Sequence, residues 1–373
     1  MLKVAISANT SWYLYNFRKN TIISLINHGY KVTAVAPIDK YSSKLEELGC
    51  EYCDLGIDQG GTNPIKDIKT FIDFFKLYNR IKPTVVLNFT PKNNIYSTLA
   101  AKLTGSKVIN NIAGLGTLFI NESIISKIAR VLYKFSQNKA DFIFFQNEDD
   151  RDLFKQNKIA ASVKNDRLPG SGADLSRFTL SPSPDDSVTR FLLIARMIYD
   201  KGIGQYVDAA RALKKRYGNT VEFRLLGFLD VDNPSAVSKA QMDKWMQEGV
   251  INYLGVSDNV EAEISLVDCM VLPSYYREGV PKSLLEAGAM GKPIVTTDNV
   301  GCRETVDEGI NGYLCEARSV TSLIQALDRI INLTHEQRLE MGKNSREKVE
   351  REFDEKIVID KYLLAINKLL NES

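Results

Sequence analysis

The sequence predicts an α/β protein made of two doubly wound, Rossmann-like domains. Its 373 residues exceed the roughly 100 to 200 residues that one domain holds. The apolar fraction of 44% and the charged fraction of 25% are those of a soluble globular protein. Short runs rich in Val, Ile and Phe alternate with helical stretches in two separate series, and strands that alternate with helices form parallel sheets.

The expected strands form two series, one before residue 146 and one after residue 189. Strands of the first series are expected at 2–6, 31–36, 84–89, 107–110 and 141–145. Strands of the second are expected at 190–195, 221–227, 251–255, 268–274, 292–297 and 312–315. The last fifty residues, 319–370, have the pattern of two long amphipathic helices.

A domain boundary is expected where the sequence becomes dense in Gly, Pro and Ser, at PGSGADLSRFTLSPSPDD. We therefore predict a first domain over 1–169, a linker over 170–189, a second domain over 190–353 and a terminal helix over 354–373. In open parallel sheets, ligands bind at the carboxyl ends of the strands. Two such domains would face each other across a cleft, where we expect the chemistry.

Composition narrows the class of protein. No stretch reaches the roughly 18 apolar residues of a membrane span, and the start of the chain lacks the regions of a signal peptide, so a cytosolic protein is expected. Five scattered cysteines fit reduced thiols, and Cys50 and Cys53 have no second pair to complete a zinc site. No nucleic-acid partner is expected.

Charge is distributed unevenly along the chain. The net charge of +2 divides into +8 for residues 1–177 and −6 for the remainder, and twelve basic residues face three acidic ones between Lys66 and Lys139. Such a patch attracts an anionic lipid surface or a phosphorylated substrate, or it is an ordinary solvated face.

One helix in this basic region, 123–138, is amphipathic. Its apolar positions are Ile125, Ile128, Leu132 and Phe135, and its basic positions are Lys127, Arg130 and Lys134. The cations lie nearly opposite the apolar side, whereas a membrane-lying helix has them flanking it. This favours a helix that packs its apolar side into the core and presents a basic outer face, which can still meet anionic lipid.

Two acidic residues bracket a predicted helix start within SYYREGVPKSLLEAGAMGKPIVTTD, residues 274–298. Glu278 precedes Pro281, which suits the first helical turn, and Glu286 lies inside the helix. A helix N-terminus binds anions such as a diphosphate, and carboxylates accept hydroxyl hydrogen bonds. The pair indicates a sugar nucleotide, although a favourable helix start explains the spacing equally well.

Two cations follow the first strand of the second domain. Arg196 comes directly after RFLLIA, and Lys201 comes five residues later, before a helix that begins near Gly202. Together they can clamp a diphosphate and neutralise it as a leaving group. A solvated pair near a helix start is the simpler alternative.

Taken together, Arg196, Lys201, Glu278 and Glu286 match in order the motifs of the family-4 retaining glycosyltransferases, which this chain resembles over nearly its whole length. The segment GSGADLSRF resembles the family's interdomain segment. The resemblance implies a GT-B fold whose terminal helix returns to the first domain. It implies catalytic roles for Glu278, Arg196 and Lys201. It implies donor-binding roles for Glu286, Gly279, Val280, Pro281, Gly227, Tyr253 and Leu254.

The first domain resembles the members that extend polyprenyl-diphosphate-linked sugars, through SANTSWYLYNFR and NNIAGLGTLF. The acceptor-binding residues implied are Asn9, Thr10, Arg18, Gly114 and Gly116. Many members place a histidine in the second segment, where this chain has Ile112-Ala113-Gly114. A histidine-based mechanism is therefore not expected.

The resemblance implies transfer of a hexose or N-acetylhexosamine from a nucleotide sugar, with uracil as the expected base, to a lipid-linked glycan at the inner face of the cell membrane. No cofactor or metal is expected, and Asp230-Val-Asp232 is interpreted as a turn. A UDP-sugar 2-epimerase of the same architecture and a non-catalytic sugar-nucleotide-binding subunit remain alternatives. An oxidoreductase is disfavoured because no G-x-G-x-x-G follows the first strand.

Overall fold

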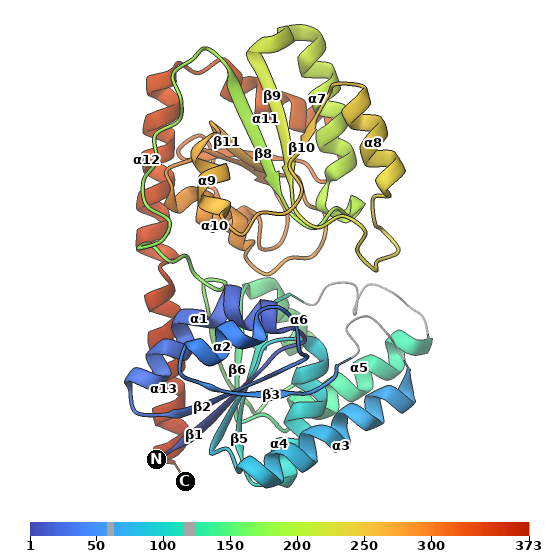
Figure 1. Cartoon of the computed structure of the whole chain (residues 1–373), viewed down its shortest axis with the longest axis vertical. Helices are drawn as coiled ribbons and strands as arrows, with labels where there is room; N and C mark the ends of the chain where they lie inside the picture. The colour runs from blue at the N-terminus through green and yellow to red at the C-terminus, as the bar shows by residue number, and fades with distance from the viewer. Residues whose placement is uncertain (58–62, 115–123, 373) are drawn as a thin grey trace. The chain divides into compact units, whose positions relative to one another are not determined.

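The protein is described by a computed structural model that covers residues 1–57, 63–114 and 124–372, with the side chains of these residues apart from 124–127 and 129. The chain forms two compact units (Figure 1). The first comprises Met1–Ser171 and Lys356–Ser373, and the second comprises Gly172–Glu355. Each unit contains one parallel sheet.

The first unit has a seven-stranded sheet in the order β3-β2-β1-β4-β5-β6-β7. Its strands are β1 (Lys3–Ser7), β2 (Lys31–Ala36), β3 (Glu51–Asp54), β4 (Val85–Asn88), β5 (Lys107–Ile112), β6 (Phe142–Phe145) and β7 (Lys164–Arg167). Its helices are α1 (Ser11–Asn27), α2 (Ser42–Glu47), α3 (Pro64–Ile81), the π-helix η1 (Asn93–Ser97), α4 (Thr98–Leu103), α5 (Ile124–Gln137), α6 (Glu148–Gln156) and α13 (Glu355–Asn371).

Helices cover both faces of this sheet. Leu14 of α1, Leu45 of α2 and Tyr362 of α13 pack in one buried cluster with alternate residues of β1, β2 and β4. Phe74 of α3 and Tyr133 of α5 pack in a second cluster against the other face, together with residues of η1, α4 and α6. Burial on both faces explains why the central strands are continuous apolar runs.

Two strands were not expected from the sequence. β3 and β7 are the polar segments EYCD and KNDR, and they form the two edges of the sheet. An edge strand pairs on one side only and is partly exposed, so it needs no apolar run. Backbone pairing with β2 and β6 holds these two strands in the sheet, although their sequences lack the apolar pattern that predicts a strand.

The expectation for the orientation of helix α5 was wrong. Ile128 and Phe135 are 57% and 54% exposed, whereas Tyr133, Ser136 and Gln137 are buried. The amide of Gln137 anchors the helix, since its Nε2 donates to the carbonyl of Asn94 at 2.9 Å and its Oε1 accepts from Asn110 at 2.9 Å. A buried polar network therefore docks α5. Ile128 and Phe135 face outward, whereas Leu132 packs against the core as expected. The side chains of Ile125 and Lys127 lie outside the described set.

The terminal helix α13 packs on the first unit, as the resemblance implied. Tyr362 is fully buried, and its hydroxyl donates to Asn111 Oδ1 at 2.5 Å. Its ring meets Phe89 and Phe144 edge-on, with centroids 5.9 and 5.2 Å apart. Lys361 pairs with Asp166 of β7 at 2.8 Å. The chain thus closes its first core with its last helix.

The second unit has a six-stranded sheet in the order β10-β9-β8-β11-β12-β13. Its strands are β8 (Thr189–Ile194), β9 (Val221–Leu226), β10 (Asn252–Tyr253), β11 (Cys269–Leu272), β12 (Ile294–Thr297) and β13 (Gly312–Cys315). Its helices are η2 (Tyr199–Lys201), α7 (Ile203–Tyr217), η3 (Gly218–Thr220), α8 (Lys239–Gln247), α9 (Val260–Ser265), α10 (Lys282–Ala289), η4 (Arg303–Thr305), α11 (Val320–Ile331) and α12 (His335–Glu352).

Most of the segment expected to be a linker, 170–189, belongs to this second unit. Phe178 is buried in its core, Ser181 N donates to Met290 O at 3.1 Å, and Ser183 Oγ donates to Val267 O at 3.0 Å. The chain passes between the units at Ser171–Gly172 and again at Glu355–Lys356. None of the helices in the described ranges is long and apolar enough to cross a membrane.

We predict that replacing Tyr362 by Ala destabilises the first unit by about 3 to 5 kcal/mol, because it empties an aromatic site in the core. Leu364 is a matched control on the same helix. It is 68% exposed, and its replacement by Ala is expected to change the free energy of unfolding by less than about 0.5 kcal/mol.

Urea unfolding followed by tryptophan fluorescence measures this difference. Trp12 lies in the first unit and Trp245 in the second, so a Trp245→Phe background reports the first unit alone. Equal losses for Tyr362→Ala and Leu364→Ala would contradict the docking of α13 described above.

Candidate functional site

The sheet of the second unit has a switch point between β8 and β11. From β8 the strand order runs to β9 and β10 on one side and to β11, β12 and β13 on the other. In open parallel sheets a crevice forms outside the carboxyl ends of the strands at such a point, and ligands bind there. The segments that follow β8 and β11 carry the residues singled out from the sequence.

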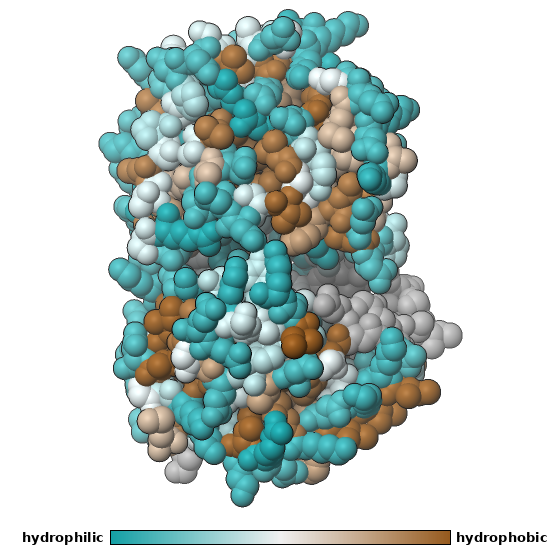
Figure 2. Space-filling view, viewed as in Figure 1, coloured by the Kyte–Doolittle hydropathy of each residue, from teal (hydrophilic) through white to brown (hydrophobic). Residues whose placement is uncertain are grey.

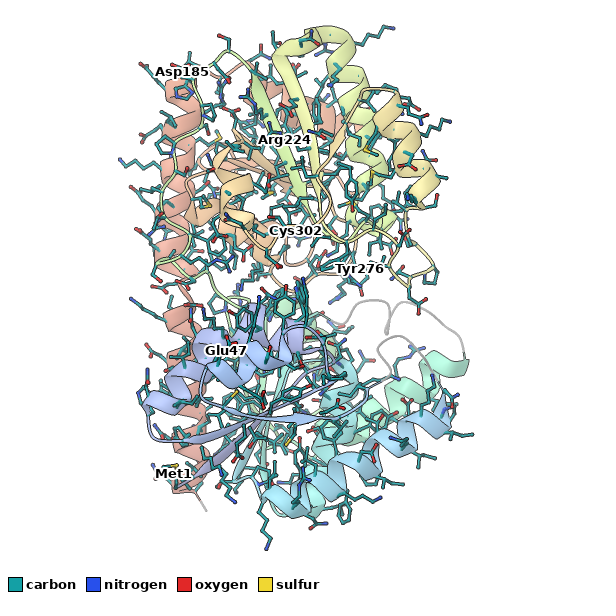
Figure 3. All side chains as sticks on the ribbon, viewed as in Figure 1. Met1, Glu47, Asp185, Arg224, Tyr276 and Cys302 are labelled. Carbon is teal, nitrogen blue, oxygen red and sulfur yellow. The ribbon has the colours of Figure 1, made fainter. Side chains whose placement is uncertain are left out.

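These two segments are tied together through the backbone. The carbonyl of Asp200, after β8, accepts hydrogen bonds from the amides of Tyr275 and Tyr276, after β11, both at 3.0 Å. Figure 3 labels Tyr276, which lies at this end of the sheet. Residues 75 and 76 positions apart in the sequence therefore become direct neighbours.

Where these two segments meet, at the carboxyl ends of the strands, the ammonium of Lys201 forms an ion pair with the carboxylate of Glu278. The two side chains are 13% and 11% exposed. Ser274 Oγ donates to the same carboxylate oxygen at 2.9 Å, and the ammonium lies over the Tyr276 ring, 5.4 Å from its centroid. The structure thus brings together the predicted cation and the predicted carboxylate.

Arg196 follows the same strand as Lys201. It is the second residue after β8 and is exposed. Burial and the charge of Glu278 raise the pKa of the Tyr276 hydroxyl, while the positive charge of Arg196 opposes the shift. Because both predicted cations follow β8, they belong to the same carboxyl end of the sheet.

Two residues that the sequence interpretation did not assign hold the Glu278 loop in place. The hydroxyl of Thr297 donates to the carbonyl of Ser274, and Asn299 Nδ2 donates to the carbonyls of Ser274 at 3.3 Å and Tyr276 at 3.0 Å. Both lie at or just after the carboxyl end of β12. Polar residues at a strand end were the signal that could have found them.

A glycine after β12 is also required by the same loop. Gly301 has φ +78°, and a Cβ atom there would lie 1.5 Å from the carbonyl oxygen of Gly279. Gly202, with φ +77°, would meet the carbonyl oxygen of Pro273 at 2.1 Å. The backbones around Glu278 and Lys201 are therefore in close contact that only glycine permits.

Helix α10 begins at this edge. Pro281 is its N-cap residue, with φ −65°, and Gly279, Val280 and Pro281 are buried, so they contribute backbone rather than side chains to a ligand surface. The first amides of a helix have no partner within it and favour anions. A diphosphate near Lys201 would meet this helix start.

Glu286 lies on α10, one turn beyond Lys282, whose ammonium is 3.8 Å from its carboxylate. Burial raises the pKa of the Glu286 carboxyl, against the opposing charges of Lys282 and Arg177. Its side chain is 14% exposed. A partly buried carboxylate of this kind suits hydrogen bonds from neighbouring hydroxyls.

The remaining predicted donor residues lie at the carboxyl ends of β9 and β10. Tyr253 Oη donates to the carbonyl of Gly227 at 2.8 Å, and Leu254 N donates to the carbonyl of Leu225 at 2.8 Å. A Cβ on Gly227 would lie 1.9 Å from the carbonyl oxygen of Ala195, directly before Arg196. Gly227 therefore adjoins the end of β8, and Tyr253 and Leu254 are tied to Gly227 and to β9.

The predicted acceptor residues lie in the first unit and are placed differently from one another. Asn9 and Thr10 follow β1, where Thr10 caps α1 by accepting from Tyr13 N at 3.0 Å, and Gly114 follows β5 with φ +101°. Arg18 is 1% exposed, with its guanidinium 4.3 Å from the centroid of Phe89, so it supports the core there. Gly116 lies outside the described residues.

The described residues contain no group of three or more His, Cys, Asp or Glu side chains placed to hold a metal ion. Asp230 and Asp232 are exposed in the loop between β9 and α8. Asp230 has φ +56°, a left-handed conformation typical of a turn. The turn expected from Asn233-Pro234 is consistent with this geometry.

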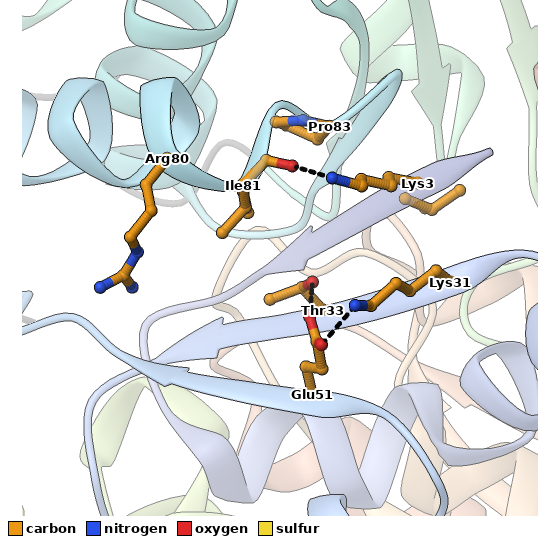
Figure 4. A pocket seen from close by; sticks show the side chains of 8 residues that line it. Lys3, Lys31, Thr33, Glu51, Arg80, Ile81 and Pro83 are labelled. Carbon is orange, nitrogen blue, oxygen red and sulfur yellow. Dashed lines mark hydrogen bonds and ion pairs between the residues drawn. The ribbon is translucent and has the colours of Figure 1, made fainter. Parts of the chain in front are cut away.

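A hollow in the first unit lies at the amino ends of the strands of its sheet (Figure 4). It is lined by Lys3, Lys31 and Glu51, the first residues of β1, β2 and β3, and Lys31 pairs with Glu51 at 2.6 Å. Ligands of open parallel sheets bind at the carboxyl ends of the strands. We therefore do not assign the substrate site to this hollow.

Two Rossmann-like units, one with a cation–carboxylate pair at its switch point beside a helix start, are the features of the GT-B glycosyltransferases. Sequence comparison agrees with this class. Residues 181–348 match the family of glycosyl transferases group 1, and residues 3–147 match the glycosyl transferase 4-like family. Each of the two family models matches one unit, and the chain is a glycosyltransferase.

Curated relatives are similar over most of the chain. The N,N'-diacetylbacillosaminyl-diphospho-undecaprenol alpha-1,3-N-acetylgalactosaminyltransferase of Campylobacter jejuni is 26% identical and covers 99% of both chains. The UDP-Gal:alpha-D-GlcNAc-diphosphoundecaprenol alpha-1,3-galactosyltransferase of Escherichia coli is 24% identical over 78% of this chain and 76% of its own.

Solved structures show the same fold. HepE from Anabaena in complex with UDP-glucose superposes with a TM-score of 0.80 at 14% identity, over 99% of this chain and 100% of its own. Sucrose-phosphate synthase from Thermosynechococcus elongatus gives 0.81 at 16% identity, over 100% of both chains. At these identities the likeness concerns the fold alone.

We predict that Gly301→Ala abolishes the thermal stabilisation of the protein by UDP, because the added methyl displaces the loop that carries Glu278. Gly309→Ala is the matched control. Gly309 has a similar φ of +77°, but a Cβ there meets no atom within 4 Å. Both variants carry the backbone strain of about 1 kcal/mol, and only the first carries the clash.

The measurement is the shift of melting temperature with added UDP. We expect Gly309→Ala to keep the shift of the parent protein and Gly301→Ala to lose it. An unchanged shift in both variants would show that the Glu278 loop does not form the nucleotide site.

Proposed function

We propose that this glycosyltransferase moves a hexose or N-acetylhexosamine from a UDP-sugar to a polyprenyl-diphosphate-linked glycan with retention of configuration and without a metal ion. The single observation that carries the proposal is the Lys201–Glu278 pair at the switch point of the second sheet. A cation for the leaving phosphate and a carboxylate for sugar hydroxyls lie there side by side.

The donor is assigned to the second unit by charge and position. Arg196, Lys201 and the start of α10 supply positive potential for the diphosphate. Glu278 is suited to hold the donor sugar's hydroxyls and Glu286 those of the ribose, since a carboxylate accepts two hydrogen bonds at once. Because Lys201 and Glu278 are in contact, a bound donor would bridge them at the junction of sugar and phosphate.

The proposed mechanism is front-side displacement. The acceptor oxygen bonds to the anomeric carbon on the face from which the diphosphate leaves, the bond between the anomeric carbon and the phosphate oxygen breaks, and the departing phosphate takes the hydroxyl proton. Arg196, Lys201 and the first amides of α10 stabilise the charge that develops on the leaving group. Glu278 holds the donor and is not assigned the role of nucleophile.

The acceptor class is proposed from the relatives. The Campylobacter jejuni and Escherichia coli enzymes are named for diphospho-undecaprenol-linked sugars. Asn9, Thr10 and Gly114, at the carboxyl ends of β1 and β5, are the acceptor-binding candidates that the structure describes in an accessible position. A lipid-linked acceptor implies work at the inner face of the cell membrane.

We predict that Glu278→Gln and Lys201→Ala each lower the turnover of the donor by about 100-fold or more, the effect of removing one group that stabilises a transition state. Matched controls are Glu336→Gln and Lys239→Ala, which change exposed residues of the same unit and are expected to keep full activity.

The measurement is the release of UDP in the presence of the acceptor, with and without EDTA. Turnover near that of the parent protein in both Glu278→Gln and Lys201→Ala would refute the assignment. Strict dependence on Mn²⁺ would refute metal independence alone.

A panel of nucleotide sugars tests the donor and separates the rival activities. We predict that one UDP-sugar raises the melting temperature above the shift given by UDP, because a ligand stabilises the folded state in proportion to its occupancy. Incubation with that donor alone should leave its sugar unchanged, and transfer should require an acceptor. Epimerised sugar nucleotide would identify a 2-epimerase instead, and binding without transfer to any lipid-linked acceptor would favour a binding subunit.

A further inference from the structure

Two helices of the first unit expose apolar side chains that a packed core would bury. Ile65, Ile68 and Ile72 of α3 and Ile128, Val131 and Phe135 of α5 are between 41% and 79% exposed. We call these six side chains the apolar face. Single exposed apolar residues are common on protein surfaces, but six on two helices that cover the same face of the sheet mark an interaction surface.

The helical repeat explains why these residues form a face. Each set follows the i, i+3, i+7 spacing, which aligns side chains on one side of a helix. The buried residues Phe74 and Tyr78 of α3, and Tyr133 and Gln137 of α5, point to the core instead. Phe71 and Leu77 of α3 and Leu132 of α5 also pack against the core, so each helix carries apolar side chains on its outer side as well as on its inner side. A helix that only packs on a core is apolar on its inner side alone.

The two helices belong to the same layer. Both pack against the π-helix η1, and residues of both enter the same buried cluster on one face of the sheet. Figure 2 shows the part of the apolar face over α3 as a brown band with hydrophilic side chains beside it. The surface is thus broader than a single helix.

Cations border the apolar face. Lys69 and Lys76 lie four residues after Ile65 and Ile72 on α3, so each lies next to the stripe, and Lys134 lies three residues after Val131 on α5. All three are exposed, although Lys69 pairs with Asp73 at 2.6 Å and Lys134 donates to the carbonyl of Asn157 at 3.1 Å. Lys139 lies over the ring of Phe135, 5.7 Å from its centroid. Apolar residues bordered by Lys and Arg are the arrangement of helices that lie in a membrane interface.

We propose that the apolar face docks on an anionic phospholipid bilayer, with its six side chains at the boundary of headgroups and acyl chains and the lysines on the headgroup phosphates. Charge complementarity selects this occupant. A second copy that used the same face would bring two basic surfaces together, which repel each other. An anionic bilayer satisfies the apolar and the charged parts of the surface at once.

Docking in this way would orient the first unit for its proposed reaction. Helices α3 and α5 follow β3 and β5, so they begin at the carboxyl edge of the sheet, and Ile65, Ile68 and Ile128 lie in their first two turns. Asn9, Thr10 and Gly114 lie at the same edge. An acceptor anchored in the docked leaflet would reach the carboxyl ends of these strands. This last step rests on the proposed function, whereas the docking itself does not.

Flotation with lipid vesicles tests the proposal on the full chain, without donor or acceptor. One set of vesicles contains phosphatidylcholine alone, and the other contains phosphatidylcholine with phosphatidylglycerol. We expect binding to the anionic vesicles that weakens as salt is raised, because the lysines are screened. Ile68→Ser with Phe135→Ser should lower the binding about tenfold or more, the value of removing buried apolar groups from an interface.

Matched controls change residues of the first unit that lie outside α3 and α5. Ile38→Ser with Leu364→Ser removes two exposed apolar side chains elsewhere on the unit, and Lys19→Glu with Lys368→Glu reverses two exposed charges there. Neither pair should reduce binding, whereas Lys76→Glu with Lys134→Glu should reduce it about tenfold or more. The melting temperature of each variant without vesicles verifies that it is folded.

The proposal is overturned if the parent protein does not float with anionic vesicles at low salt, or if the controls lose as much binding as the variants of the apolar face. It is also overturned if the apolar variants abolish self-association in light scattering and leave vesicle binding unchanged, which would identify a second copy as the occupant. Flotation without sugar transfer would leave docking established and refute only the transferase assignment.

Discussion

The contact between Lys201 and Glu278 is the interaction on which the candidate donor site depends. It joins the segment after β8 to the segment after β11, and the carbonyl of Asp200 joins the same two segments through the backbone. Ser274, Thr297 and Asn299 then fix the loop that carries Glu278. Removing one partner of this nearly buried pair would cost free energy of folding, because the remaining charge would lack its counterpart. A sugar diphosphate would bind to the same two charges, so Lys201 and Glu278 would contribute both to the stability of the fold and to donor binding.

The parallel sheet is the constraint that makes this pair possible. Every strand of the second sheet ends at one edge, so residues that follow different strands meet there although they are far apart in the chain. Glycines allow the loops to approach each other, as Gly301 does against Gly279 and Gly202 against Pro273. The first unit uses the same architecture for another purpose. Its carboxyl edge carries the accessible acceptor candidates, and its outer helices present the apolar face.

Much of the fold and the main part of the candidate site could be predicted from the sequence. The central strands are continuous apolar runs. Arg196, Lys201 and Glu278 are charged residues between a strand end and a helix start, and Glu286 lies within the helix that follows. The edge strands β3 and β7 were missed because their polar residues carry no such pattern. The orientation of α5 was wrong because Gln137 anchors the helix through amide hydrogen bonds, which no hydrophobic period reveals. Thr297 and Asn299 were missed because their role depends on backbone carbonyls of a loop more than twenty residues earlier.

A crystal structure of the protein with a bound UDP-sugar tests the central claim most directly. The account predicts the diphosphate within hydrogen-bond distance of Lys201 and the start of α10, with the sugar hydroxyls on Glu278 and the ribose on Glu286. A donor bound elsewhere, for example in the hollow lined by Lys31 and Glu51 or at the carboxyl edge of the first sheet, would contradict the assignment of the donor site to the Lys201–Glu278 pair.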